Sequence, residues 1–229
     1  MLKKVWIYGA PFSGKTTCAM KAPKPFILST DGNAQYVTDD YKLITDEVTV
    51  KGRMVERKLA WEVFEEEIEK LETGSEYETI VVDLVEDTYE LCRLYMYNKL
   101  KITHESDDSF RAWDKVRTRY LSTMRKLINL PYNIILISHD DTTKDLTKRS
   151  GESVTKIEPN IQEKIARKLA GMVAVAGYAT ANKNKYELHI KPDDITFGGG
   201  RLGVNGVTIP LDWVEIEKLF NDTKKGGNK

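Results

Sequence analysis

The sequence has very little cysteine, no surplus of charge of either sign and no long hydrophobic run. Its two cysteines, Cys18 and Cys92, share no C-x-x-C or metal-ligand spacing, so we expect reduced core residues rather than disulfides or a zinc site. Lysine plus arginine equals aspartate plus glutamate, at 35 each, so no global field draws the chain to nucleic acid or to a membrane. No apolar stretch approaches about 18 residues, and "MLKK" leads straight into a strand. We therefore expect a cytoplasmic protein without a membrane span, signal peptide or membrane partner.

What the sequence does contain is the glycine-rich stretch "GAPFSGKTT", which fits the pattern G-x-x-x-x-G-K-[ST]. The apolar run "VWIYG" before it reads as a buried strand, and "KTTCAMKA" can open a helix. The two pattern glycines can turn backbone N–H groups inward on an anion, and Lys15 can reach the β- and γ-phosphates. The Thr16 hydroxyl can ligate Mg²⁺. The stretch predicts a site for ATP and Mg²⁺ formed by Gly9, Ala10, Pro11, Phe12, Ser13, Gly14, Lys15, Thr16 and Thr17.

Strands and helices alternate along the chain, which predicts an α/β fold with a mostly parallel sheet and helices on its faces. The residues from 140 to 160 read as a polar connection, too long for an ordinary loop. One domain over 1–220 and a flexible tail over 221–229 are expected. Strands are expected at 4–8, 25–30, 79–84 and 133–139, irregular β structure at 41–58, helices at 59–72, 86–99, 109–129, 161–171 and 212–220, and a hairpin within 172–192.

Three polar residues stand at the ends of expected strands, where a ligand crevice forms in this architecture. Asp83 closes "TIVVD" and is the candidate second metal-site acid, although a carboxylate capping the next helix is the alternative. Asp31, in "LSTDGN", is a candidate catalytic base or water-orienting group, or else part of an ordinary Asp-Gly turn. His139 ends "NIILISH" and is either a γ-phosphate sensor or a satisfied structural histidine. With Lys15, Asp31 and His139 form the candidate catalytic set.

Taken together, these stretches resemble the RecA-type recombinase ATPases. The similarity is closest to the short phage forms known as Sak-type single-strand-annealing ATPases or phage nucleotide-binding proteins. That superfamily typically carries a proline and a serine or threonine at the positions of Pro11 and Ser13. It places an acid before a glycine where this chain has Asp31-Gly32, usually a glutamate, and a sensor, usually glutamine, where His139 stands. The resemblance covers most of residues 3–200 and implies a RecA-like P-loop NTPase core with a C-terminal β-hairpin.

The resemblance also implies partners. In those proteins the segment after the sensor is a DNA-binding loop, which here spans 140–160. Neighbouring subunits supply further cations near the end of a late hairpin. Single-stranded DNA, a homo-oligomeric ring or filament and a single-strand DNA-binding protein are therefore the expected partners, in a bacterial host cytoplasm if the gene is a phage's. The expected DNA-binding residues are Lys144, Lys148, Arg149 and Lys156, and the residues expected to act in trans are Lys191 and Arg201.

A second candidate DNA surface is "SFRAWDKVRTRY", which interleaves aromatic and basic residues. On a helix, however, Phe110, Trp113, Val116, Tyr120 and Met124 form one stripe, and core packing is the commoner meaning of such a stripe. Both interpretations stay open at this point.

The leading hypothesis is a single-domain ATPase that binds Mg-ATP and single-stranded DNA and supports homologous recombination or annealing. One alternative is a nucleotide or small-molecule kinase, although the sequence has no compact arginine-rich lid and no extra loop glycines. Another is a partner ATPase, such as a helicase loader or packaging accessory. DNA-dependent, acceptor-dependent or protein-dependent turnover separates the three.

Overall fold

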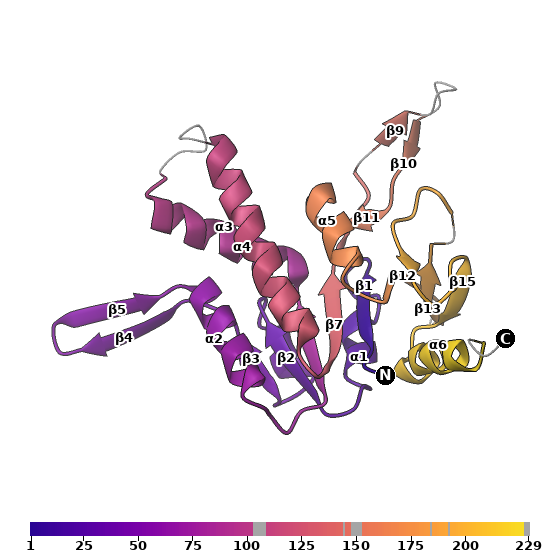
Figure 1. Cartoon of the computed structure of the whole chain (residues 1–229), viewed down its shortest axis with the longest axis horizontal. Coiled ribbons are helices and arrows are strands. Elements are labelled where there is room, and N and C mark those ends of the chain that lie inside the picture. Colours follow the sequence, from indigo (N-terminus) through magenta and orange to yellow (C-terminus); the bar gives the residue numbers. More distant parts are fainter. Residues whose placement is uncertain (103–108, 144, 148–152, 184, 192, 227–229) are drawn as a thin grey trace.

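The computed structural model describes residues 1–102, 109–143, 145–147, 153–183, 185–191 and 193–226. Within these residues one large sheet has the strand order β15-β13-β12-β1-β7-β6-β2-β3, and β14 pairs with β12 (Figure 1). The strands from β12 to β3 are mutually parallel, whereas β13, β14 and β15 are antiparallel to their neighbours. The predicted α/β fold with a mostly parallel sheet and a C-terminal hairpin, β12–β13, is confirmed. The strands are β1 (Lys4–Tyr8), β2 (Pro25–Ser29), β3 (Tyr41–Leu43), β6 (Thr79–Asp83), β7 (Asn133–Ser138), β12 (Val175–Asn182), β13 (Lys185–Ile190), β14 (Gly199–Gly200) and β15 (Val207–Pro210).

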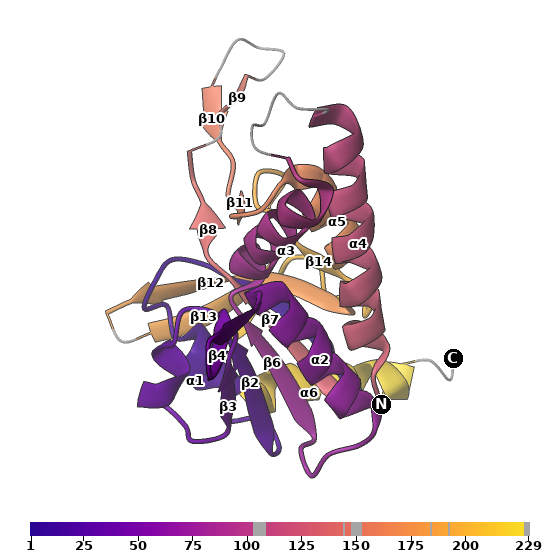
Figure 2. The ribbon, with the colours of Figure 1, turned by 90° about the vertical axis from the view of Figure 1, so that its left-hand side faces the viewer.

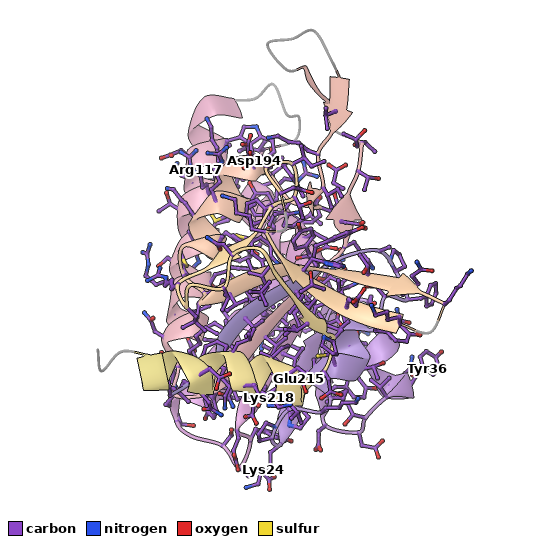
Figure 3. The ribbon with its side chains drawn as sticks, turned by 90° about the vertical axis from the view of Figure 1, so that its right-hand side faces the viewer. Lys24, Tyr36, Arg117, Asp194, Glu215 and Lys218 are labelled. Carbon is purple, nitrogen blue, oxygen red and sulfur yellow. The ribbon has the colours of Figure 1, made fainter. Side chains whose placement is uncertain are left out.

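Helices cover both faces of the sheet, because side chains of successive strand residues point to opposite faces. In β1, Trp6 packs with the cluster under α2, α3, α4 and α5, whereas Val5 and Ile7 pack with the cluster under α1 and α6 (Figure 2). Glu215 and Lys218 of α6 form an ion pair of 2.6 Å at the surface (Figure 3). The helices are α1 (Lys15–Ala19), α2 (Ala60–Glu72), α3 (Val85–Leu100), α4 (Ser109–Asn129), α5 (Glu163–Ala170) and α6 (Trp213–Gly226).

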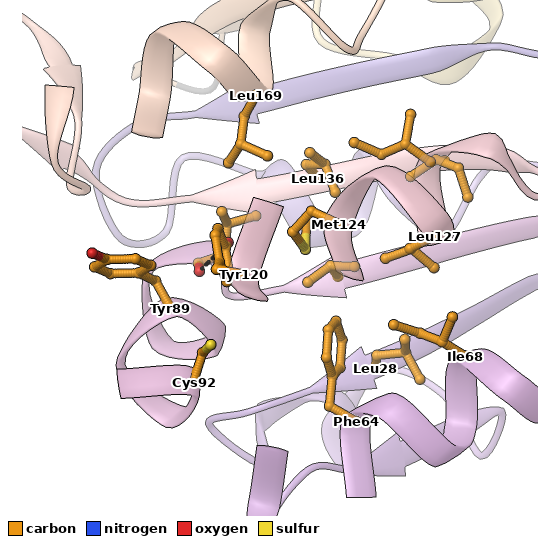
Figure 4. Close-up of a cluster of buried hydrophobic side chains, with 14 of the residues drawn as sticks. Leu28, Phe64, Ile68, Tyr89, Cys92, Tyr120, Met124, Leu127, Leu136 and Leu169 are labelled. Carbon is orange, nitrogen blue, oxygen red and sulfur yellow. Dashed lines mark hydrogen bonds between the residues drawn. The ribbon is translucent and has the colours of Figure 1, made fainter. Parts of the chain in front are cut away.

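The larger hydrophobic cluster lies between the sheet and the helices α2 to α5 (Figure 4). The stripe on α4 belongs to it, since Val116, Tyr120 and Met124 are fully buried. Core packing is therefore the correct interpretation of these three residues, while the side chain of Phe110 lies outside the described residues. The two cysteines are free and buried, as predicted.

Several boundaries differ from the sequence-based expectations. The helix expected over "KTTCAMKA" ends at Ala19. The region 41–58 contains a regular hairpin, β4 (Glu47–Lys51) and β5 (Met54–Lys58), that projects from the body of the molecule (Figure 1). Helix α6 continues to Gly226, so the chain is helical well into the segment 221–229 that we expected to be a tail. No helix among the described residues combines the length and the apolar character needed to cross a membrane.

The connection expected over 140–160 contains two short antiparallel ladders. Strand β8 (Asp140–Asp141) pairs with β11 (Glu158–Pro159), and β9 (Asp145–Thr147) pairs with β10 (Ser153–Thr155). Together they form an arm that leaves the end of β7 and rises beside α5 (Figures 1 and 2). Strand β7, which carries this arm, lies between β1 and β6 in the sheet.

Candidate functional site

The loop from Gly9 to Thr17 leaves the end of β1 and runs directly into α1, as the sequence predicts. Gly14 has a φ of 85°, in the left-handed region that glycine adopts without steric penalty. A Cβ atom on Gly9 would lie 2.3 Å from the carbonyl oxygen of Ala179 in β12, so the loop packs too closely for a larger residue. These two glycines let the backbone curl at the sheet edge into the shape that a phosphate-binding loop requires.

The Lys15 side chain is folded into this curl and is only 5% exposed. Its Nζ donates hydrogen bonds of 2.7 Å to the Gly9 carbonyl, 2.8 Å to the Ala10 carbonyl and 3.3 Å to the Ser13 hydroxyl. Burial lowers the pKa of Lys15, and the negative charge of Asp83 partly offsets this shift. A buried ammonium whose partners are neutral oxygens favours an incoming anion, and a phosphate group would be a stronger partner than these carbonyls.

Thr16 and Asp83 meet below the loop. The Thr16 Oγ1 in α1 donates a hydrogen bond of 2.8 Å to Asp83 Oδ2 at the end of β6. Burial raises the pKa of Asp83 to about 6, and the Thr16 hydrogen bond opposes this shift. A hydroxyl and a carboxylate are oxygen ligands that suit Mg²⁺, which usually takes one or two protein ligands and fills the remaining positions with water and phosphate. The described residues hold no cluster of three or more His, Cys, Asp or Glu able to bind a metal, so the pair fits Mg²⁺ bound together with a nucleotide.

A cavity of about 880 Å³ opens over the loop, within the range of small-molecule and cofactor sites. Of the nine loop residues, those from Pro11 to Thr17 line it, while the backbone of Gly9 and Ala10 holds Lys15 from behind. The Tyr186 ring in β13 packs over Gly14, since its Cδ1 lies 2.9 Å from where a Cβ would stand. Tyr186 and Leu211 therefore form an apolar wall of the cavity. We did not expect this wall from the sequence, because nothing in the pattern of β13 places Tyr186 beside the loop.

Asp31 lies at the rim of the same cavity and is exposed. Its Oδ1 accepts a hydrogen bond of 3.0 Å from the Asn33 backbone N–H, and its Oδ2 accepts one of 2.6 Å from the Asn33 side-chain amide. These bonds make Asp31 a turn residue before the short 3-10 helix η1 (Asn33–Tyr36). The turn and a place at the cavity are compatible, because the bonds to Asn33 hold the carboxylate in one orientation. The neighbouring Asp87 accepts a hydrogen bond of 2.8 Å from Thr30 Oγ1.

His139 also lines the cavity, at the end of β7. Its ring Nδ1 lies 3.0 Å from Oε1 of Glu86 in the first turn of α3, and its backbone N–H donates to the same oxygen at 2.8 Å. The sequence analysis did not single out Glu86. The available signal was its position three residues after Asp83, in a helix that starts at the edge of the sheet where the loop lies.

The expected DNA-binding residues are brought together only in part. Lys144, Lys148 and Arg149 lie outside the described residues. Lys156 is described and forms an ion pair of 3.0 Å with Glu158, so its charge is compensated within the chain. Of the alternative surface on α4, Arg119 pairs with Glu65, and Arg117 pairs with Asp114.

The residues expected to act in trans lie away from the chain's own loop. The Arg201 backbone N–H donates to the Ala174 carbonyl, and the Ala174 N–H donates in turn to the Lys4 carbonyl at the start of β1. Strand β1 has five residues, which span about 16 Å, and the loop begins at its other end. Lys191 follows the end of β13, which runs antiparallel to β12 and so away from the loop. Neither cation is therefore beside the phosphate loop of its own chain.

The geometry so far describes a phosphate-binding loop, a hydroxyl–carboxylate pair and a histidine at the end of the strand between them. No curated protein matches the chain. A family model described as an AAA domain matches residues 2–202, a range that contains every site residue named above. The chain therefore belongs to the AAA domain family of P-loop, nucleotide-binding ATPases.

Proposed function

We propose that this protein is a RecA-like ATPase that binds Mg-ATP and single-stranded DNA and supports homologous recombination or strand annealing. The observation that carries the proposal is the position of His139 at the end of β7, between the phosphate loop on β1 and Asp83 on β6. A residue there can contact a γ-phosphate held by the loop. It also begins the arm that contains β8 to β11. Nucleotide state and arm position can therefore be coupled through a single residue.

Each site residue has a distinct task in this proposal. Lys15 exchanges its carbonyl partners for the β- and γ-phosphates, while Thr16 and Asp83 hold Mg²⁺. When bound, Mg²⁺ supplies positive charge that neutralises the phosphate oxygens. Asp31, oriented by its two bonds to Asn33, accepts a proton from the attacking water. Asp31→Asn should therefore keep ATP binding and lose turnover, and unchanged turnover would remove Asp31 from the mechanism.

The apolar wall of the cavity supports binding of a nucleoside rather than of phosphate alone. Tyr186 is 44% exposed although it packs on Gly14, so one part of its ring remains free to contact a planar base. Leu211 adjoins it. We propose that the base of ATP lies against this pair.

Contacts around His139 support the coupling to DNA. The Asn160 backbone N–H donates a hydrogen bond of 2.9 Å to the His139 carbonyl, and β8 pairs with β11 immediately after it. Both ends of the arm are thus fastened at His139. Lys144, Lys148 and Arg149, with Lys156 once DNA phosphates replace Glu158, would contact the strand. Assembly into a ring or filament, cooperation with a single-strand DNA-binding protein and action in a bacterial host cytoplasm complete the proposal.

The test is steady-state ATP hydrolysis with and without single-stranded DNA, with Lys15→Ala as the matched inactive control. We expect slow basal turnover that single-stranded DNA stimulates and Lys15→Ala abolishes. Turnover that ignores DNA but requires a phosphoryl acceptor would instead identify a kinase. Neutralising Lys144, Lys148, Arg149 and Lys156 together should reduce the salt dependence of DNA affinity by a slope of about 0.7 per lost phosphate contact. Parental affinity and slope in that variant would contradict the arm as the DNA site.

The projecting β4–β5 hairpin favours a second candidate, an ATPase that acts on a protein partner. In the register of this hairpin Val50 pairs with Val55, and Val48 lies on the same face. These three side chains are 59 to 67% exposed, and exposed apolar groups that lie together commonly mark interaction sites. Replacing the three valines with threonine should leave DNA-stimulated turnover intact. Loss of turnover in cell extract but not in purified protein would favour the partner ATPase.

A further inference from the structure

Glu86 and His139 form a pair that separates two cavities. Oε1 of Glu86 accepts the His139 backbone N–H at 2.8 Å and lies 3.0 Å from the ring Nδ1. The Glu86 side chain is 11% exposed and the His139 side chain 33%. His139 lines the nucleotide cavity, whereas Glu86 lines a second cavity of about 530 Å³ between α3, α4 and α5. One oxygen of Glu86 therefore fixes both the main chain and the ring of the residue beside the loop.

This geometry restricts where protons can sit on the ring. With one proton on the pair, the favourable place is Nδ1, because a bare Nδ1 would face the carboxylate with its lone pair, and Nε2 is then a hydrogen-bond acceptor. With a second proton, either the imidazolium faces the carboxylate or the carboxylic acid donates to Nδ1. In both of these arrangements Nε2 carries a hydrogen and is a donor. The protonation of Nε2 therefore follows the proton count of the pair, whichever partner holds the charge.

We propose that Glu86 is a positioning residue that makes His139 Nε2 a proton-dependent contact for the γ-phosphate: an acceptor in the nucleotide-free protein and a donor once phosphate is bound. The additional proton comes from solvent as the phosphate arrives, and it returns to solvent when phosphate leaves. This inference rests on the proposed ATPase function for its biological role, but the restriction on the ring does not.

The surrounding charges agree with this direction. Burial lowers the pKa of His139, and the positive charge of Lys15 lowers it further, whereas Asp87, Asp140 and Asp31 raise it. Burial raises the pKa of Glu86 to about 7, opposed by the His139 backbone N–H. Phosphate bound at Lys15 would neutralise the group that lowers the pKa of His139 and add negative charge, so the second proton should be bound more tightly in the complex.

The test is the ¹⁵N NMR spectrum of the histidine rings at pH 8.5, first without nucleotide and then with Mg²⁺ and a non-hydrolysable ATP analogue. His139→Gln assigns the signal. In the nucleotide-free protein we expect Nδ1 protonated and Nε2 bare, and in Glu86→Ala we expect the Nε2-protonated tautomer to dominate. His189, held between Thr180 and Thr208, is the internal control and should not change. An Nε2-protonated His139 in the nucleotide-free parent, or the same tautomer in parent and Glu86→Ala, would overturn the proposal.

A second measurement separates this inference from the proposed function. Calorimetry of the analogue in buffers of different ionisation heat counts the protons taken up on binding. At pH 8.5 we expect uptake approaching one proton in the parent and less than half of that in Glu86→Gln, which keeps the acceptor oxygen but not the charge. Binding without proton uptake in the parent contradicts the proton-dependent contact and leaves nucleotide binding intact. Failure of the analogue to bind at all contradicts the ATPase proposal, while the tautomer result still decides the role of Glu86.

Discussion

The hydroxyl of Thr16 and the carboxylate of Asp83 lie 2.8 Å apart although 67 residues separate them in the chain. The hydrogen bond joins the first turn of the helix after the phosphate loop to the end of β6, and Asp83 is 7% exposed. A Mg²⁺ ion bound with nucleotide would take both oxygens as ligands. The pair therefore links metal binding to phosphate binding.

Replacing Asp83 with asparagine should remove the contribution of Mg²⁺ to nucleotide affinity, because an amide oxygen is a weaker ligand for this ion than a carboxylate. We expect parental binding of a fluorescent ATP analogue to strengthen at least about tenfold on adding Mg²⁺, a gain of about 1.4 kcal/mol. Asp83→Asn should show little or no gain. Asp87→Asn is the matched control, since Asp87 bonds to Thr30 instead, and it should keep the Mg²⁺ effect. The same Mg²⁺ dependence in parent and Asp83→Asn would contradict the metal assignment.

Gly9→Ala tests the packing of the loop on β12. The added Cβ would meet a backbone carbonyl oxygen at 2.3 Å, which cannot move without shifting β12. We expect the free energy of unfolding to fall by about 1–3 kcal/mol and nucleotide binding to weaken. Gly171→Ala is the control, because Gly171 has a φ of −66° and its nearest new contact is 3.3 Å. Urea denaturation measures both, and equal stability of the two variants would show that the loop is not held this tightly.

The strands and helices that could be predicted are those whose local pattern agrees with their packing. The buried runs "TIVVD" and "NIILIS" are continuous because helices cover both faces of the sheet, and the α4 stripe follows the helical period. The phosphate loop was predictable because its chemistry is local. Glu86 was not, because its partner His139 is 53 residues away and neither neighbourhood signals the contact. The course of β4–β5 was unpredictable for a related reason, since a hairpin that packs on nothing leaves no periodic trace of its direction.

Glu86 should make stability depend on pH. Its pKa rises from 4.5 to about 7 on folding, so the folded state binds this proton more tightly than the unfolded state does. Stability from this group is fully present below about pH 4.5 and is lost as the pH rises through about 7. At pH 8, Glu86→Gln should therefore raise the free energy of unfolding by ~1–3 kcal/mol, with no gain near pH 4. Glu90→Gln, on the exposed side of the same helix, is the control. A Glu86→Gln variant no more stable than the parent at pH 8 would contradict this direction.

Lys191 and Arg201 test assembly, because neither is near the loop of its own chain. If a neighbouring subunit supplies one of them, Lys191→Ala and Arg201→Ala should both bind ATP and at least one should fail to hydrolyse it. Mixing that variant with Lys15→Ala should restore part of the activity, since one kind of boundary then has two intact halves. Lys218→Ala, at the surface of α6, is the control. Light scattering that finds a monomer under saturating ATP and single-stranded DNA would contradict this arrangement.

The most direct measurement of the central claim is the affinity of the parent and of Lys15→Ala for Mg-ATP by titration calorimetry. The parent should bind one ATP per chain. Lys15→Ala should bind at least about tenfold to a hundredfold more weakly, because the phosphates lose a charge-assisted hydrogen bond, while its unfolding temperature stays close to parental. Lys21→Ala should bind within about threefold of the parent, since Lys21 lines the same cavity but is exposed and paired with Asp212. Equal affinity of the parent and Lys15→Ala would contradict the account, because the loop would then not be where the nucleotide binds.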